Sequence, residues 1–450
     1  MQKYKLLLIH PFNRDLLKVE SNSLKRGLSN YALFEPLCLG ILAALTNEKW
    51  NVKILDECIE ELTETSTCEF YDLVAITSDT CTIPRAIEIS KMFREKNIKT
   101  IIGGIHASVN IEESKKFFNI VVIGEAEMVW RELIHDYETN CLKELYKTDT
   151  FFDLNNAVLP RRDLFSDKYV FSVVYTSRGC PSNCTFCAVT KFFGRKQRHR
   201  PIESVICELK EIKQGKMVFF SDDDIIGNSK SGWERARMLF KQIIENDIKI
   251  NWHAFASIEI AYHDDILESA AKSGCRWLYI GIESINKLVL KEMNKSKNIV
   301  SKTASVNKLI KKINSYGIMV YGGFIIGNDN DDKKNIRKLI RFIKYSFVNG
   351  FALFVLTPLP GTDLFQKMLF ENRLFYNNYP KDWTRYNLSE LSFTPKQIMA
   401  DDFNQEYKRG QLLLNSRSIK YIKFILTLYT TRSLDLAKEI YNFYKYSVNV

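Results

Sequence analysis

Short apolar runs alternate with amphipathic stretches through the first part of the chain. The runs that are typical of buried strands lie at residues 5–9, 52–55, 73–77, 100–102 and 120–123. Five such strands separated by helices predict a doubly wound, Rossmann-like parallel sheet, which we expect to span residues 1–138. Sheets of this kind bind ligands in the crevice beyond the carboxyl ends of their strands, so the residues that follow the strands are candidate binding residues.

A second alternating series begins near residue 169. Its apolar runs lie at residues 169–176, 217–220, 250–256, 277–282, 318–324 and 351–356. Helical segments separate them, near residues 203–214, 231–246, 264–273, 300–316 and 332–346. Six strands with helical crossovers predict a partial (β/α)6 barrel of the TIM type, because eight strands would close the barrel. We expect a linker at 139–168, the barrel at 169–360 and a helical C-terminal region at 361–450.

The composition is that of an ordinary globular protein. The chain has 450 residues, of which 46% are hydrophobic and 26% are charged, and this suits two or three packed domains. The apolar run near the N-terminus is too short for a signal-peptide core or a membrane span. Ten cysteines without a secretory segment favour reduced thiols or a metal site over a disulfide scaffold. We expect a cytoplasmic protein without a transmembrane segment.

The net charge is +11. The lysines are scattered among asparagines and isoleucines, which favours a solvated basic surface. Charge alone leaves open binding to nucleic acid or to a membrane surface, but we do not expect nucleic acid as a partner.

The segment that carries most chemistry follows the first barrel strand. Cys180, Cys184 and Cys187 are separated by three residues and then by two. This spacing allows three sulfurs to surround one side of a four-iron cluster, in a tight loop that Gly179 and Pro181 favour. Three ligands leave one iron open for a small chelating molecule. The alternative is a structural zinc site with Cys207 or His199 as the fourth ligand, although such sites usually pair their cysteines in two distant knuckles.

This loop, with Phe186 before its last cysteine, resembles the radical S-adenosylmethionine superfamily, and the resemblance extends across the barrel. It implies that the open iron of a [4Fe–4S] cluster binds S-adenosylmethionine and that reductive cleavage gives a 5′-deoxyadenosyl radical. It also implies an external electron donor such as flavodoxin or ferredoxin.

The loops at the carboxyl ends of barrel strands carry the chemistry in barrel enzymes. By resemblance, the candidate contacts to S-adenosylmethionine are Phe186, Ser221, Asp222, Ser257, Glu283 and Gly327. The aspartates at 222–224 are equally consistent with a helix N-cap, and Gly327 with a plain turn. Burial of Glu283 without a partner would be unfavourable, which favours a ligand role for it.

Residues 35–44, 103–107 and 122–127 resemble the cobalamin-binding domain that precedes the barrel in one radical subclass. The candidate cobalamin residues are His10, Pro11, Thr77, Ser78, Gly103, Gly104, His106, Gly124 and Glu125. The string Asp-x-His-x-x-Gly, which supplies a lower-ligand histidine in other cobalamin domains, does not occur. Its absence leaves binding open, because relatives often lack it and still bind the cofactor with its base detached.

The domain pairing predicts methylation of an unactivated carbon, or of a phosphinate phosphorus, in a small-molecule or lipid-like biosynthetic intermediate. A non-methylating rearrangement, cyclisation or carbon–carbon bond formation is an alternative. Another is a tRNA methylthiotransferase, but Cys38, Cys58, Cys68 and Cys81 do not sit at matching strand ends and the C-terminal region reads as helical. The last alternative is a non-catalytic corrinoid or iron–sulfur carrier, which the intact open-iron loop disfavours.

Overall fold

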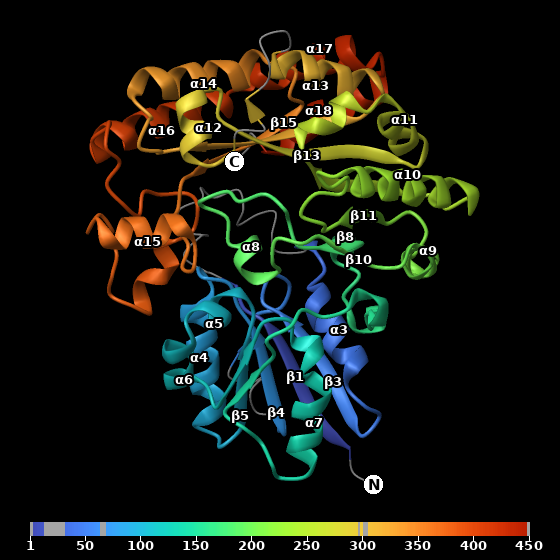
Figure 1. Ribbon diagram of the computed structural model, residues 1–450, viewed down its shortest axis with the longest axis vertical. Helices are drawn as coiled ribbons and strands as arrows, with labels where there is room; N and C mark the ends of the chain where they lie inside the picture. Colours follow the sequence, from blue (N-terminus) through green and yellow to red (C-terminus); the bar gives the residue numbers. More distant parts are fainter. Residues whose placement is uncertain (1–2, 13–31, 64–68, 296–297, 300–304, 448–450) are drawn as a thin grey trace.

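The computed structural model describes residues 3–12, 32–63, 69–295, 298–299 and 305–447. Two parallel sheets lie one above the other along the long axis of the molecule, the N-terminal sheet at one end and the barrel at the other (Figure 1). Of the sequence predictions, the start of the helix at 300–316 and Cys68 fall outside the described residues.

The N-terminal sheet has the strand order β3-β1-β4-β5-β6-β7, all parallel. Its strands are β1 (Tyr4–His10), β3 (Trp50–Asp56), β4 (Leu73–Thr77), β5 (Lys99–Gly103), β6 (Ile120–Ile123) and β7 (Leu145–Lys147). Its helices are α3 (Leu37–Leu45), α4 (Ile83–Arg94), α5 (Ile105–Val109), α6 (Ile111–Phe117) and α7 (Trp130–Glu138). The five predicted strands are confirmed, while β7 was not predicted and lies in the expected linker.

Alternate residues of β1 show why this part of the chain folds as a doubly wound sheet. Leu6 and Leu8 pack into one hydrophobic cluster and Leu7 and Ile9 into another. Both faces of the strand are therefore buried under helices, which is the environment that a continuous apolar run predicts.

The second sheet has seven strands in the order β15-β14-β13-β12-β11-β8-β2. Six of them were predicted: β8 (Tyr169–Val174), β11 (Met217–Phe220), β12 (Asn251–Ala256), β13 (Cys275–Glu283), β14 (Met319–Ile326) and β15 (Gly350–Val355). The seventh, β2 (Ala32–Phe34), pairs in parallel with β8 although it comes from the N-terminal part of the chain. Three residues are too few to show a period, so the sequence pattern missed this edge strand.

Helices cover the outer face of the barrel sheet. They are α9 (Ile202–Glu211), α10 (Lys230–Glu245), α11 (Asp264–Lys272), α13 (Val306–Ser315) and α14 (Lys333–Tyr345). Helix α12 (Lys287–Glu292) packs instead in the cluster that contains Ile325 and Phe186 of the cysteine loop. Shorter elements flank the first loop: β9 (Ser177–Arg178), α8 (Val189–Phe192) and β10 (Arg198–His199). The partial barrel predicted from the alternation of strands and helices is confirmed.

The C-terminal region is helical, as predicted, and packs against both the N-terminal sheet and the barrel. After α15 (Asp363–Phe370), Trp383 and Tyr386 pack into the core of the N-terminal sheet and so join the two halves. The helices α16 (Ala400–Leu414), α17 (Arg417–Thr431) and α18 (Leu434–Ser447) lie at the far end of the barrel (Figure 1). Within the described ranges, every helix falls short of the length and apolar character that crossing a bilayer requires. The domain limits given above stay a prediction.

Candidate functional site

The cysteine loop lies between β9 and α8, directly after the first barrel strand. Gly179 has a φ of 91°, and a Cβ at this position would collide with the carbonyl oxygen of Lys196. A glycine is therefore required here for the chain to turn sharply into Cys180. The amide of Cys180 donates to the carbonyl of Gly194 at 3.3 Å, which closes the loop on itself.

Two further segments hold the middle of the loop. Thr185 donates its amide to Met293 O at 3.2 Å and accepts from the amide of Leu364 at 2.9 Å. The ring of Phe186 packs against the apolar cluster that contains Met293 and Leu364. Phe186 therefore supports the loop by packing; its contact with S-adenosylmethionine stays a prediction.

The spacing of the three thiols argues against a single zinc ion. Two thiolates at the zinc–sulfur distance of about 2.3 Å in a tetrahedral site are about 3.8 Å apart. Among the described residues, the three sulfurs do not form a group within 4.8 Å of one another; the group that does is His10, Asp56 and Cys58. Cys207 is exposed on α9.

The thiols are partly buried, and burial raises the pKa of all three, that of Cys187 to about 11. They are therefore neutral near pH 7 unless a metal binds, and metal binding would release their protons.

The carboxylates after β11 hold the barrel strands together. Asp222 is fully buried and accepts from the amide and hydroxyl of Thr176, both at 2.6 Å, and from the Ser177 hydroxyl at 2.7 Å. It thus ties the end of β8 to the end of β11. The helix-cap alternative is wrong, because α10 begins at Lys230 with Ser229 as its N-cap.

Asp224 has a similar structural role one strand further on. It accepts from the amides of Ile226 and Ser257, each at 3.3 Å, and burial raises its pKa to about 7. The hydroxyl oxygen of Ser257 is buried. It lies beside the Asp224 carboxylate, and its interaction with this carboxylate acts to lower the pKa of Asp224, although burial outweighs it. Ser221 is exposed beside this group.

Glu283 has a partner that the sequence did not reveal. Its carboxylate forms an ion pair with Lys295, and its backbone adopts a φ of 62°. The ion pair removes the reason that burial gave for a ligand role of Glu283, and its contact with S-adenosylmethionine stays a prediction. Lys295 lies close enough to Cys184 to lower the pKa of that thiol, although burial outweighs this effect. The pair places a cation and an anion beside the cysteine loop.

Gly327 lies at the end of β14. Its φ is 93°, and its amide donates to the carboxylate of Asp331 at 3.0 Å. This geometry favours the turn interpretation of Gly327, and its contact with adenine stays a prediction.

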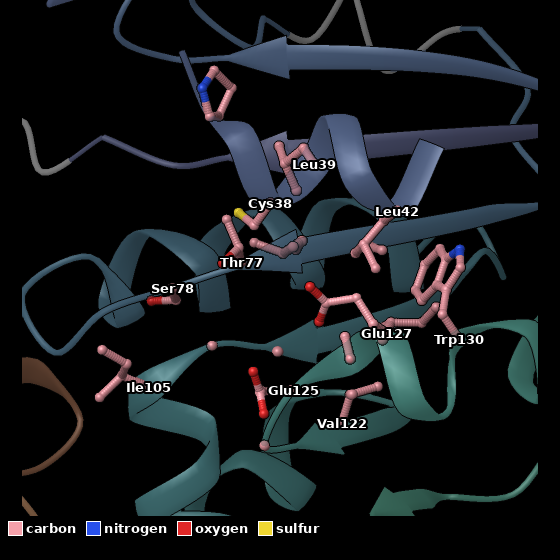
Figure 2. A pocket seen from close by; sticks show the side chains of 18 of the residues that line it. Cys38, Leu39, Leu42, Thr77, Ser78, Ile105, Val122, Glu125, Glu127 and Trp130 are labelled. Atoms are coloured by element: carbon pink, nitrogen blue, oxygen red, sulfur yellow. The ribbon is translucent and has the colours of Figure 1, made fainter. Parts of the chain in front are cut away.

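A cavity of about 320 Å³ opens at the carboxyl edge of the N-terminal sheet. Figure 2 shows it from close by, with Thr77, Ser78 and Glu125 around it. Of the predicted cobalamin residues, the lining contains His10, Thr77, Ser78, Gly103, Gly104, Gly124 and Glu125. Its volume is within the usual range for small-molecule sites.

Two predicted cobalamin residues do not line this cavity. Pro11 is buried beside the end of β1. His106 is fully buried, where it bonds to Glu113 at 3.0 Å and packs against the Trp383 ring. The buried position of His106 is explained by its packing against Trp383 of the C-terminal region.

Small and apolar residues shape the cavity. Gly124 has a φ of 77°, and a Cβ built there would meet nothing within 4 Å, so the glycine leaves open space. Cys38, Leu42 and Trp130 form apolar walls. Sequence reasoning missed these three residues, because they come from helices and not from strand ends. The arrangement fits part of a large, mostly apolar-faced cofactor.

His10 sits at the rim of the cavity in a fixed orientation. Its Nδ1 bonds to Asp56 at 3.0 Å, and Asp56 also accepts from the Tyr169 hydroxyl at 2.8 Å. Burial acts to lower the pKa of His10, but the hydrogen bond and charge of Asp56 outweigh it and raise the pKa.

Ionic contacts join the cavity to the cysteine loop. Arg178, two positions before Cys180, donates to Glu125 at 2.7 Å and to Glu127 at 2.6 Å. Arg198 adds a second cation, at 2.9 Å from Glu125. Arg178, Glu125 and Glu127 all line the cavity. We call this group the Arg178 bridge. Glu127 and Arg178 were missed because contacts between distant loops leave no periodic signal.

Comparisons with known proteins match both halves. Residues 174–343 match the radical SAM superfamily, and residues 33–134 match the B12-binding domain. The chain is 27% identical to the bacteriochlorophyllide d C-12(1)-methyltransferase of Chlorobaculum tepidum over 97% of this chain and 95% of that protein. It is 25% identical to the hopanoid C-2 methylase of Rhodopseudomonas palustris over 77% of this chain and 66% of that protein.

A solved structure has the same fold. The cobalamin-dependent S-adenosylmethionine radical enzyme OxsB, with aqua-cobalamin and S-adenosylmethionine bound, covers all of this chain and 71% of its own, with a TM-score of 0.70 and 14% identity. The N-terminal sheet, the partial barrel and the C-terminal helices together are therefore one known architecture.

Proposed function

Because the chain belongs to the radical S-adenosylmethionine superfamily, in the subclass with an N-terminal cobalamin-binding domain, we propose that it methylates an unactivated carbon of a biosynthetic intermediate. A phosphorus centre is the second acceptor that this chemistry permits. When bound, the [4Fe–4S] cluster would supply the electron for cleavage of S-adenosylmethionine to methionine and a carbon radical, and cobalamin would supply the methyl group. The observation that carries the proposal is the Arg178 bridge, which connects the cysteine loop directly to the cobalamin-type cavity.

The chain's own residues perform binding and positioning. We propose that Cys180, Cys184 and Cys187 hold the cluster, and that Ser257, which directly follows the carboxyl end of β12, is one of the S-adenosylmethionine contacts. The carboxylate of Asp222 is already satisfied by three donors, so its contribution is to hold the strand ends in place.

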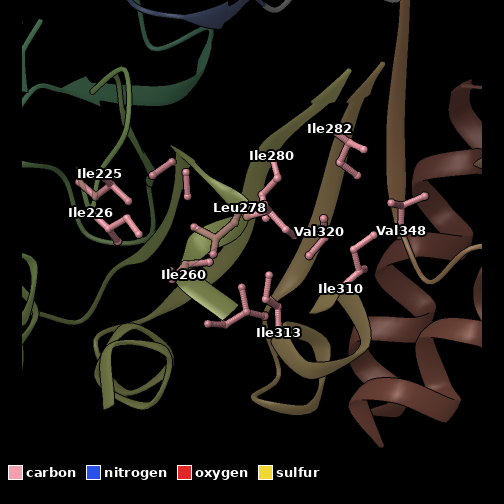
Figure 3. Close-up of a cluster of buried hydrophobic side chains, with 14 of the residues drawn as sticks. Ile225, Ile226, Ile260, Leu278, Ile280, Ile282, Ile310, Ile313, Val320 and Val348 are labelled. Atoms are coloured by element: carbon pink, nitrogen blue, oxygen red, sulfur yellow. The ribbon is translucent and has the colours of Figure 1, made fainter. Parts of the chain in front are cut away.

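A belt of aromatic rings on the inner face of the barrel supports a bulky apolar substrate. The outer face of the sheet carries Leu278 and Val320, which pack into the core beneath the helices (Figure 3). Because side chains alternate along a strand, the residues next to these in the sequence face the interior of the barrel. The rings of Phe255 and Tyr279 are 5.0 Å apart, and those of Tyr279 and Tyr321 are also 5.0 Å apart.

This belt precedes the candidate cofactor contacts along the strands: Phe255 lies two residues before Ser257, and Tyr279 lies four residues before Glu283. Phe255 is 37% exposed, and Tyr279 and Tyr321 are partly exposed. Exposed faces of aromatic rings favour the binding of flat or extended apolar substrates. A small-molecule or lipid-like substrate of this kind agrees with the names of the methyltransferases that the chain resembles, which act on a bacteriochlorophyllide and a hopanoid.

The test is anaerobic incubation of the reconstituted protein with labelled S-adenosylmethionine and a one-electron donor such as flavodoxin or ferredoxin. We expect 5′-deoxyadenosine and one bound corrinoid per chain. Absence of 5′-deoxyadenosine under reducing conditions would reject the radical step. Radical cleavage without bound corrinoid would instead favour the non-methylating alternative.

The structure disfavours a tRNA methylthiotransferase. Cys58 and Cys81 do follow β3 and β4, against the sequence expectation. However, residues 400–447 form three helices, so this described part of the chain holds no small RNA-binding barrel.

A further inference from the structure

Helix α17 presents an apolar face to solvent. Tyr421, Ile425 and Tyr429 are 53%, 63% and 62% exposed, and their spacing of four residues puts them on one side of the helix. The opposite side is buried: Ile419 packs in a cluster with Trp277, and Lys423 donates to carbonyl oxygens at the end of α14. The helix is thus anchored by one face and largely exposed on the other, where the ring of Tyr421 also contacts that of Tyr441 on α18.

The last turn of the preceding helix also exposes apolar side chains. Leu412 and Leu413, in the last turn of α16, are 68% and 40% exposed. Only residues 415 and 416 separate the two helices. Isolated exposed apolar residues are ordinary, but a contiguous set along one surface marks an interaction site.

The segment that forms this surface carries charge of one sign, and acids follow on α18, at Asp435 and Glu439. Between residues 407 and 434 the sequence contains no aspartate or glutamate, and its cations are Lys408, Arg409, Arg417, Lys420, Lys423 and Arg432. Lys423 is buried and does not contribute to the surface. From the neighbouring helix, Lys311 donates to the Tyr429 hydroxyl at 3.1 Å. Cations therefore flank the exposed tyrosines.

We propose that the outer face of α17, with the last turn of α16, docks on an anionic lipid bilayer. A helix that combines exposed aliphatic and tyrosine side chains with flanking lysine and arginine lies in the plane of a membrane interface. A second copy of this chain would bring the same cations face to face across a two-fold axis, which is unfavourable. Nucleic acid would satisfy the cations but leave Ile425 and Leu412 in water.

The surface is distant from the catalytic region. Helix α17 lies at the end of the molecule opposite the N-terminal sheet (Figure 1), at the bottom of the barrel where Ile419 contacts Trp277 and Met319. Docking here would leave the cavity and the cysteine loop free in solvent. The inference does not depend on the proposed methylation, because no residue of α16 or α17 lines the cavity.

The test is flotation of the full-length holoprotein with vesicles of phosphatidylglycerol and phosphatidylcholine, compared with vesicles of phosphatidylcholine alone. We expect co-flotation with the anionic vesicles only, and its loss at high salt, because screening weakens surface electrostatics. Ile425→Glu combined with Leu412→Glu should lower the partition at least about tenfold, since each change places an acid at the apolar contact.

Met238→Glu is the matched control, because Met238 is a 53% exposed apolar residue of α10 on another part of the barrel. It should float like the wild type. Lys420→Gln tests the cation separately and should weaken partition about fivefold. No flotation, equal flotation of the double variant, or a dimer in light scattering that Ile425→Glu dissociates would each overturn the proposal.

Discussion

The two sheets present their carboxyl edges in opposite ways. At the edge of the N-terminal sheet, glycines and small polar residues such as Gly103, Gly124 and Thr77 surround an open cavity. At the edge of the barrel, Asp222 and Asp224 turn inward and accept hydrogen bonds from neighbouring strand ends. The first edge is built around empty space, while the second uses its polar groups to fix its own loops.

This difference separates residues that line a cavity from residues that hold neighbouring loops in place. Both kinds follow strands, so their position in the chain is the same. Only the partners of each side chain distinguish them.

The largest effect is expected for Cys184→Ala. Loss of one of three thiolates should abolish cluster binding and therefore 5′-deoxyadenosine formation, measured as iron per chain and by product chromatography. Cys207→Ala is the control, because Cys207 is an exposed thiol outside the loop. Equal iron content in both variants would contradict the assignment of the cluster.

Arg178→Gln probes the connection between the two edges. Glu127 would lose its cation, and Glu125 would keep only Arg198. We expect the loop that lines the cavity to loosen and corrinoid affinity to fall about tenfold, about 1.4 kcal/mol, with iron content unchanged. Arg237→Gln, which breaks an exposed pair with Asp265, is the control for loss of an arginine. Unchanged corrinoid affinity in Arg178→Gln would show that the bridge does not shape the cavity.

Asp222→Asn probes the supporting role of the barrel carboxylates. The amide would place a donor where Thr176 and Ser177 already donate, so buried donors would be left without an acceptor. This costs about 1–3 kcal/mol of unfolding free energy, measured by urea denaturation. Asp265→Asn, at an exposed pair, should change stability little. If Asp222→Asn is fully stable but loses affinity for S-adenosylmethionine, Asp222 is a ligand and the comparison fails.

The smallest effect is expected at the opposite edge of the N-terminal sheet. Burial acts to raise the pKa of Glu138, but hydrogen bonds from Lys49, Asn47 and Trp50 outweigh it and lower the pKa to about 2. A depressed pKa adds stability that is present above the unfolded value of 4.5 and is lost as the pH falls toward 2.

Glu138→Gln should therefore destabilise the protein by about 1 kcal/mol at neutral pH, and this difference should shrink progressively as the pH falls from 4.5 toward 2. Corrinoid affinity should not change, because Glu138 does not line the cavity. A difference that is independent of pH would contradict the ionic origin of the effect.

Much of the fold could be predicted because burial on both faces of a parallel strand leaves a continuous apolar run. The run at 217–220 predicted β11 with the bounds that the structure has. The pattern failed for β2 and β7, which have three residues each, since so short a run cannot be distinguished from an apolar loop.

The candidate site was predictable only in part, because the missing information lies in contacts between distant segments. The cysteine loop is local in sequence, and its spacing alone indicates its chemistry. Lys295 beside Glu283, and Arg178 between Glu125 and Glu127, depend on how loops of different strands meet. His106 illustrates the reverse error, since it follows a strand but is buried against Trp383.

The most direct test of the central claim is the metal and corrinoid content of the protein purified without oxygen. We predict four iron atoms and four sulfides at the three cysteines, together with one corrinoid in the N-terminal cavity. Colourless protein that holds one zinc ion at Cys180, Cys184 and Cys187 and binds no corrinoid would contradict the account.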